Sequence, residues 1–227
     1  MVSIRIAVCA LVALGSLAGL ASDARAQAKK FEIGGMLGYQ FGAIMDETTK
    51  EEQHDSAGNT ISVDSLGEAI GLPPSAAFGL TLTYHLTRTM HIEAWFLQQP
   101  TELNFDDRAA DTQAVLSDLR ATYYMIGLMY NWSETVKQPF IGFMVGWTEW
   151  KASSPYESAS GFTLAPVIGY KSWLSRTVGF RVHTSVLITN TPAGDMFKNT
   201  ETGWEYDHTK NTWATQINIS VALLLGR

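Results

Sequence analysis

The chain has 227 residues and a formal net charge of −6, and 46% of its residues are hydrophobic. An acidic chain is a poor partner for nucleic acid, so we expect no nucleic-acid binding. The single cysteine, Cys9, lies near the amino terminus. One thiol excludes a disulfide framework and a zinc site built from several cysteines.

The first 26 residues have the features of an export signal. Arg5 supplies a positive start, and an apolar run extends from Ile6 to Leu20. In the sequence Ala24-Arg25-Ala26, small residues occupy the two positions that a signal peptidase reads. We therefore expect residues 1–26 to be a signal peptide and residues 27–227 to form one exported domain without cysteine.

The exported part contains no run of the ~18–20 apolar residues that a membrane helix needs. Its longest uncharged apolar stretches, such as YYMIGLMYNW at residues 123–132, are about half that length. Two fold classes remain, a soluble all-β protein and a β-barrel of the outer membrane.

Apolar residues alternate with smaller or polar residues in eight segments, which predicts eight β-strands. Most of these segments have the ~9–11 residues that a tilted membrane strand requires. The predicted strands cover residues 31–42, 76–87, 90–97, 122–131, 141–148, 162–171, 178–188 and 213–225.

The connections between these strands alternate between long and short. The long ones are residues 46–73, 100–119, 152–160 and 191–211, and the short ones are residues 87–89, 133–139 and 174–176. A transmembrane barrel has long extracellular loops and short periplasmic turns, whereas a soluble sandwich has no reason to keep this alternation. The pattern places both chain ends on the periplasmic side.

The apolar faces of the predicted strands carry no charge in their central parts, and Arg120 and Glu149 occur only at outer ends. A charge at mid-bilayer on a lipid-facing position costs about 2–4 kcal/mol. We therefore predict an all-β fold, an eight-stranded antiparallel up-and-down transmembrane β-barrel. Its apolar face meets lipid, and its polar, glycine-rich face lines the lumen.

Aromatic residues cluster at the predicted strand ends, where interfacial girdles are expected. The expected girdle near the short turns is Tyr84, Tyr130 and Tyr170, with Trp132 and Trp173 close by. The expected girdle near the other rim is Trp147, Trp150 and Trp213.

The stretches PFIGFMVGW (residues 139–147) and FTLAPVIGY (residues 162–170) resemble strands of the small eight-stranded outer-membrane β-barrel superfamily of Gram-negative bacteria. The resemblance extends over residues 31–227 and rests on the overall pattern. It implies location in the outer membrane, a cell-envelope role and insertion by the barrel-insertion machinery. It also implies contact with outer-membrane lipids and lipopolysaccharide.

Charged and imidazole side chains of both signs fall on the lumen face: Glu93, Lys171, Arg181, His91 and His183, together with Glu32 and His85. We expect them to form a polar plug in which Glu93 balances Lys171 and Arg181, because an unpaired buried charge is costly. The alternative is a porin-like, ion-conducting constriction. An eight-stranded lumen holds little beyond its own side chains, which disfavours a general diffusion porin.

Three functional classes follow from this pattern. The first is a structural or surface-interaction role without catalytic residues, metal or cofactor, with a possible extracellular ligand at the loops. The second is a narrow channel or a side-opening conduit for small hydrophobic molecules, left open by inner-face glycines at positions 34, 38, 42, 79, 127, 142, 146 and 169. The third is a lipid A-modifying enzyme, since His183 and Ser185 resemble the His-x-Ser pair of lipid A deacylases, with Glu201 or Glu205 as acidic partner.

Overall fold

The computed structural model describes residues 31–47, 51–54, 60–63, 68–107, 112–133, 135–191, 194–196, 206–208 and 212–226. Among these residues, no helix is long and apolar enough to cross a membrane. The eight longest strands are β1 (Phe31–Phe41), β6 (Ser75–His85), β7 (Met90–Asp107), β8 (Thr112–Asn131), β9 (Lys137–Ala152), β10 (Ala159–Trp173), β11 (Val178–Thr191) and β14 (Thr212–Gly226).

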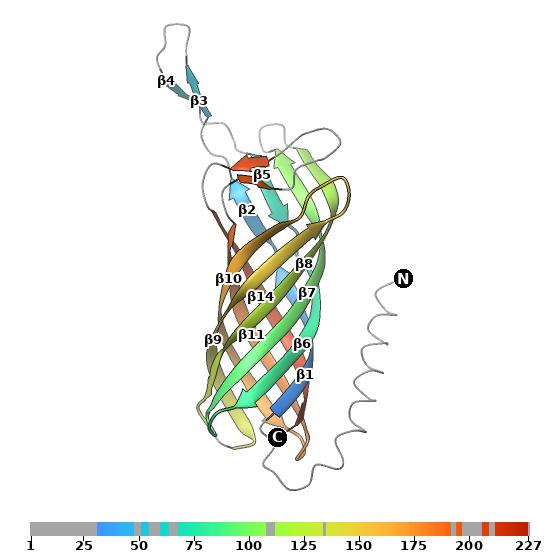
Figure 1. The fold of residues 1–227 in the computed structure, drawn as a ribbon, viewed down its shortest axis with the longest axis vertical. Coiled ribbons are helices and arrows are strands. Elements are labelled where there is room, and N and C mark those ends of the chain that lie inside the picture. The colour runs from blue at the N-terminus through green and yellow to red at the C-terminus, as the bar shows by residue number, and fades with distance from the viewer. Residues whose placement is uncertain are drawn as a thin grey trace.

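These eight strands form a closed antiparallel barrel in which each strand pairs with its neighbours along the chain, and β1 pairs with β14 (Figure 1). The predicted eight-stranded up-and-down barrel is therefore confirmed. Following paired residues once around the wall leads from Phe31 on β1 to Phe41 on the same strand, a stagger of ten residues. A stagger of this size tilts the strands by about 40° to the barrel axis.

The predicted alternation of connections is confirmed for the barrel strands. Short turns join β6 to β7, β8 to β9 and β10 to β11 at one end of the barrel. In the first of them, the backbone N–H groups of Leu86 and Thr87 both donate to the carbonyl oxygen of Met90 at 3.0 Å. The long connections lie at the other end (Figure 1).

The long connections contain more strand than the sequence predicted. Strands β7 and β8 occupy all but residues 108–111 of the connection predicted at 100–119. Two of the other three, at 46–73 and 191–211, are interrupted by β2 (Ala43–Glu47), β3 (Glu51–His54), β4 (Thr60–Val63), β5 (Glu68–Leu72), β12 (Gly194–Met196) and β13 (Tyr206–His208). In the outer parts of β7 and β8 the outward residues Glu102 and Asp118 are charged and the inward residues Leu103 and Leu119 are buried, so the apolar-outward alternation of the membrane strands is absent there.

The two faces of the wall have the predicted orientation. On β8, Ile126 and Leu128 point outward and are 54% and 52% exposed, whereas on β7 Glu93 points into the lumen and is 3% exposed. A belt of exposed apolar side chains on a closed barrel is the surface that lipid covers. Trp150 and Trp173, however, are buried in the lumen and are not part of a girdle. Each lies an odd number of residues from an outward neighbour, Trp147 or Tyr170, so it faces the opposite side of its strand.

The inner-face glycines lie where a β-carbon would collide with neighbouring atoms. A β-carbon on Gly127 would lie 2.2 Å from the carbonyl oxygen of Phe143, and one on Gly142 would lie 2.0 Å from the Sδ atom of Met129. The space beside these glycines is therefore filled by the neighbouring strand and by methionine side chains. One consequence is that even a small side chain such as serine is not tolerated at Gly127 without movement of the backbone.

Leu128→Arg should lower the free energy of unfolding in a lipid bilayer by about 2–4 kcal/mol, because it places a charge on the lipid-facing wall. Leu174→Arg is the matched control, since Leu174 is 70% exposed in the turn between β10 and β11. Equilibrium unfolding in vesicles measures the free energy of unfolding of both variants. An equal loss of this free energy at the two positions would contradict the membrane assignment of the apolar belt.

Candidate functional site: a plugged lumen and a break in the wall

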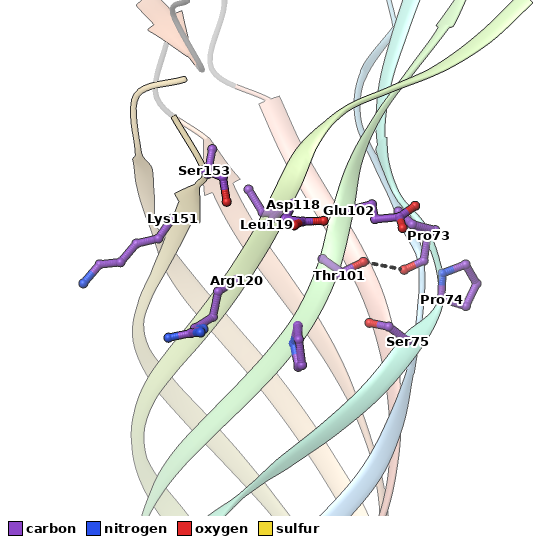
Figure 2. A pocket seen from close by; sticks show the side chains of 12 residues that line it. Pro73, Pro74, Ser75, Thr101, Glu102, Asp118, Leu119, Arg120, Lys151 and Ser153 are labelled. Carbon is purple, nitrogen blue, oxygen red and sulfur yellow. Dashed lines mark hydrogen bonds between the residues drawn. The ribbon is translucent and has the colours of Figure 1, made fainter. Parts of the chain in front are cut away.

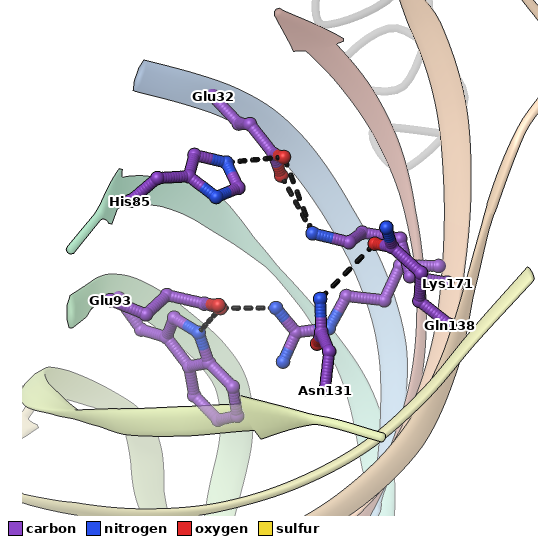
Figure 3. A network of polar contacts seen from close by, with 8 residues as sticks. Glu32, His85, Glu93, Asn131, Gln138 and Lys171 are labelled. Carbon is purple, nitrogen blue, oxygen red and sulfur yellow. Dashed lines mark hydrogen bonds and ion pairs between the residues drawn. The ribbon is translucent and has the colours of Figure 1, made fainter. Parts of the chain in front are cut away.

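The carboxylate of Glu32 joins three strands at the periplasmic end of the lumen (Figure 3). Its Oε1 lies 2.6 Å from Nε2 of His85, and Nζ of Lys171 donates to its two oxygens at 3.1 and 3.3 Å. Because β10 is not a neighbour of β1 in the wall, the bond from Lys171 to Glu32 crosses the lumen. Both side chains are almost fully buried.

A second ion pair crosses the lumen between β7 and β11. Nη1 of Arg181 and Nε1 of Trp95 both donate to Oε1 of Glu93 (Figure 3). The guanidinium carbon of Arg181 also lies 4.4 Å from the ring centre of Phe140 and 5.5 Å from that of Trp95. These cation–π contacts cover a charged group that has lost most of its hydration.

The structure brings the predicted lumen residues together but pairs them differently. Lys171 binds Glu32 and not Glu93, so each carboxylate holds one permanent cation. The prediction that Glu93 balances both cations is therefore wrong in its pairing, because the ten-residue stagger shifts distant strands relative to one another. Because each buried charge has its own counter-charge, neither pair leaves an uncompensated ion in the lumen.

The two remaining lumen histidines make no hydrogen bond through their rings within the described part of the chain. His91 packs edge-on against His85 with 4.5 Å between ring centres, and the ring of His183 lies 4.9 Å from that of Trp95. They fill space between the ion pairs and the wall.

The suggested His-x-Ser pair is not arranged for nucleophilic catalysis. Oγ of Ser185 accepts a hydrogen bond from Nδ2 of Asn218 at 3.1 Å, and no hydrogen bond joins it to the ring of His183. A serine nucleophile needs a base within hydrogen-bond reach. Glu201 and Glu205, the suggested acidic partners, lie outside the described residues.

Toward the outer end, the lumen holds an uncharged layer that the sequence analysis missed. The hydroxyl of Tyr123 donates to Oε1 of Gln216 at 2.5 Å, Nε2 of Gln216 donates to Oε1 of Gln99, and Nε2 of Gln99 donates to Oγ of Ser75. Buried leucines fill the space around this layer: Leu72, Leu97, Leu103, Leu119 and Leu187. The sequence could not reveal this layer, because each of its polar residues stands alone on its strand and binds a partner on a distant strand.

The hydrogen-bonded wall is interrupted between β6 and β7. Residues 78–85 of β6 pair with residues 91–98 of β7, and β5 pairs with β7 only from residue 104 onward. No ladder pairing joins residues 75–77 to residues 99–103 within the described segment 68–107. Pro73, Pro74 and Pro100 lie at this break, and a proline has no N–H to donate.

Two side-chain hydrogen bonds between described residues cross the break in place of the ladder. Oγ1 of Thr101 donates to the carbonyl oxygen of Pro73 at 3.0 Å (Figure 2). Nε2 of Gln99 donates to Oγ of Ser75 at 2.9 Å. A cavity of about 760 Å³ adjoins the break and extends beneath the outer ends of β8 and β9. Charged side chains line it: Glu102, Asp118, Arg120 and Lys151.

Solved structures with the same architecture are membrane barrels. The outer membrane protein OprG from Pseudomonas aeruginosa matches with a TM-score of 0.54 and 13% identity over 88% of this chain and 97% of that chain. Neisserial surface protein A matches with a TM-score of 0.53 and 8% identity over 89% of this chain and 100% of that chain. The outer membrane protein AlkL matches with a TM-score of 0.52 and 9% identity over 89% of this chain and 92% of that chain.

This chain has the fold of the small eight-stranded outer-membrane barrels. No protein-family model and no curated protein matches the sequence, so the shared feature is the architecture. The closed barrel and its exposed apolar belt together place the protein in the outer membrane.

Glu93→Ala should destabilise the refolded protein by about 3–5 kcal/mol, because it leaves the guanidinium of Arg181 buried without a counter-charge. Adding Arg181→Ala should recover part of this loss. Adding Lys171→Ala should instead be additive within about 0.5 kcal/mol, since Lys171 binds Glu32. Urea unfolding in detergent gives the free energy of unfolding of each variant, from which the two double-mutant cycles are calculated. Strong coupling of Glu93 to Lys171 would contradict the two separate pairs.

Proposed function

We propose that this protein is a non-enzymatic barrel with a closed lumen that serves structure and surface contact in the outer membrane. The observation that carries the proposal is the pair of ion bridges across the lumen, Glu32 with Lys171 and Glu93 with Arg181. Each bridge ties together strands that are not neighbours in the wall. Such bonds resist distortion of the barrel and obstruct passage along its axis.

The packing above the ion pairs supports the same role. Leu97, Leu103 and Tyr123 are fully buried in the outer half of the lumen. A conducting pore needs a continuous water-filled path, whereas a tightly packed, uncharged layer over a neutralised ionic layer opposes the passage of ions. The buried packing stabilises the barrel. The long connections extend beyond the barrel and are the parts available for contact with other molecules.

Single-channel recording on the refolded protein in planar bilayers tests this proposal. The wild-type protein should give no discrete conductance steps, and Arg181→Ala should lower stability without producing selective steps. Arg176→Ala, in the turn between β10 and β11, is the matched control because that side chain is exposed. Wild-type conductance whose ion selectivity changes in Arg181→Ala would refute the closed lumen and favour the channel.

The break between β6 and β7 favours a second function, a side-opening conduit for small hydrophobic molecules. The route would enter from the outside, pass the cavity beside Thr101 and leave between the two strands. Among the residues that the structure describes, only the side-chain hydrogen bonds of Thr101 and Gln99 cross this gap. Such side-chain hydrogen bonds can break without breaking the backbone hydrogen bonds that pair the strands.

If the protein is a conduit, Thr101→Trp should slow transfer of a small apolar dye across the outer membrane at least about tenfold, because it fills the gap. Thr177→Trp in an exposed periplasmic turn should leave the transfer rate unchanged. The rate of dye entry into cells that express each variant is the measurement. A rate that is the same for the wild type, Thr101→Trp and cells without the protein would rule the conduit out.

A further inference from the structure

The ladder between β10 and β11 has a gap at Pro166. No ladder pairing joins residues 165–166 of β10 to residues 186–187 of β11 within the described segment 135–191. The register is the same on both sides of the gap, so the two strands remain aligned through it. Toward β9 the ladder is continuous, and Pro166 pairs there with Phe143. The gap is therefore confined to one seam of the wall, the seam between β10 and β11.

The gap follows from the chemistry of proline. In a hydrogen-bonded pair of an antiparallel ladder, the two residues exchange both of their N–H···O bonds, and a proline has no N–H to donate. Because the ladder is broken only toward β11, Pro166 directs its backbone to that strand. The carbonyl oxygen of Val186, which is opposite Pro166 in the register, therefore receives no N–H from the ladder.

The gap lies halfway across the hydrocarbon layer. Two exposed aromatic residues of β10 lie four residues from Pro166, Tyr170 toward the short turns and Phe162 toward the outer end. Four residues span about 13 Å of strand, or about 10 Å along the axis at a tilt of about 40°. Exposed aromatic rings mark the two edges of the apolar layer of a barrel. Pro166 therefore lies near the middle of this layer, out of reach of the water on either side of the membrane.

The lumen supplies no water to the gap either. Its inward neighbours Ala165 and Leu187 are 0% and 1% exposed, so their side chains cover the gap from the inside. On the outside, the acyl chains of lipids carry no hydrogen-bond donor. A backbone carbonyl without a donor is costly in the hydrocarbon layer. A donor that reaches the carbonyl of Val186 from the lipid side would therefore stabilise the protein.

The lipid-facing surface beside the gap carries one hydroxyl donor. Thr184 lies two residues from Val186 on β11, and it pairs with Ile168 on β10 and with Ile219 on β14. Its side chain points outward, because its neighbour His183 points into the lumen and successive residues of a strand face opposite sides. No hydrogen bond joins the hydroxyl of Thr184 to another residue of the described part of the chain. The seam thus presents a donor and an acceptor side by side on one surface.

We propose that the seam between β10 and β11 is the contact surface of a homodimer in the membrane, in which Thr184 of each copy donates to the carbonyl oxygen of Val186 in the other. A surface that holds both a donor and its acceptor is self-complementary, so a two-fold axis along the membrane normal satisfies both groups of both copies. Polar side chains join membrane segments in this way, and small residues such as those at the gap, Pro166, Thr184 and Val186, let two walls approach closely. The proposal goes beyond the scaffold role, which a single barrel fulfils.

Sedimentation equilibrium of the refolded protein in a density-matched detergent tests the proposal, because it gives the dissociation constant of the dimer. The wild type should dimerise. Thr184→Val removes the hydroxyl and keeps the shape of the side chain, and it should raise the dissociation constant at least about tenfold, because a symmetric dimer loses two hydrogen bonds. Thr215→Val makes the same change in an exposed residue of β14, four residues further out than Ile219, and should dimerise like the wild type.

Pro166→Val separates a loss of the contact surface from a loss of the fold. Its backbone N–H can donate to the carbonyl of Val186 and close the ladder. The variant should therefore unfold at a higher urea concentration than the wild type, and yet its dimer should be at least about tenfold weaker.

Three outcomes would overturn the dimer: a wild-type protein that is monomeric at every concentration, equal weakening by Thr184→Val and Thr215→Val, or a Pro166→Val dimer as tight as that of the wild type. Single-channel recording does not depend on dimerisation. A silent but monomeric barrel would therefore reject the dimer and leave the proposed scaffold role intact.

Discussion

Eight strands closed with a stagger of ten residues enclose a lumen wide enough only for side chains, and this narrowness governs the rest of the structure. A charge that points inward must find its partner across a few ångströms, because little water can enter to solvate it. Glu32 therefore binds Lys171 from another side of the barrel, and Glu93 binds Arg181. The same narrowness makes Gly127 a necessity, since a β-carbon there would collide with the neighbouring strand.

The period-two pattern predicted the wall almost completely, because lipid on one side and a packed lumen on the other impose opposite chemistry on successive residues. It could not predict which inward residues bind each other. Lys171 and Glu32 are 139 residues apart, and their contact depends on the strand stagger, which no local pattern records. For the same reason Tyr123, Gln99 and Gln216 could not be identified as one layer.

The pattern also failed where the membrane ends. The outer parts of β7 and β8 are regular strand, but their outward residues are charged and their inward residues include buried leucines, so the apolar-outward pattern is lost there. Trp150 was misplaced for a related reason: an aromatic residue near a strand end suits either face, and only its distance from Trp147 reveals that it points inward. Counting positions along the strand would have found this, whereas residue type alone did not.

The position of exposed charges on the wall is set by depth. Within the hydrocarbon layer an exposed charge is costly, so the central part of the described lipid-facing wall carries none. At the level of Pro100 this restriction is lifted, and the same cross-strand row carries Arg120 and Lys151. A cationic pair is tolerated at this level because headgroups and water can reach it. Exposed charge on the described wall is thus confined to the levels at which the strands leave the apolar layer.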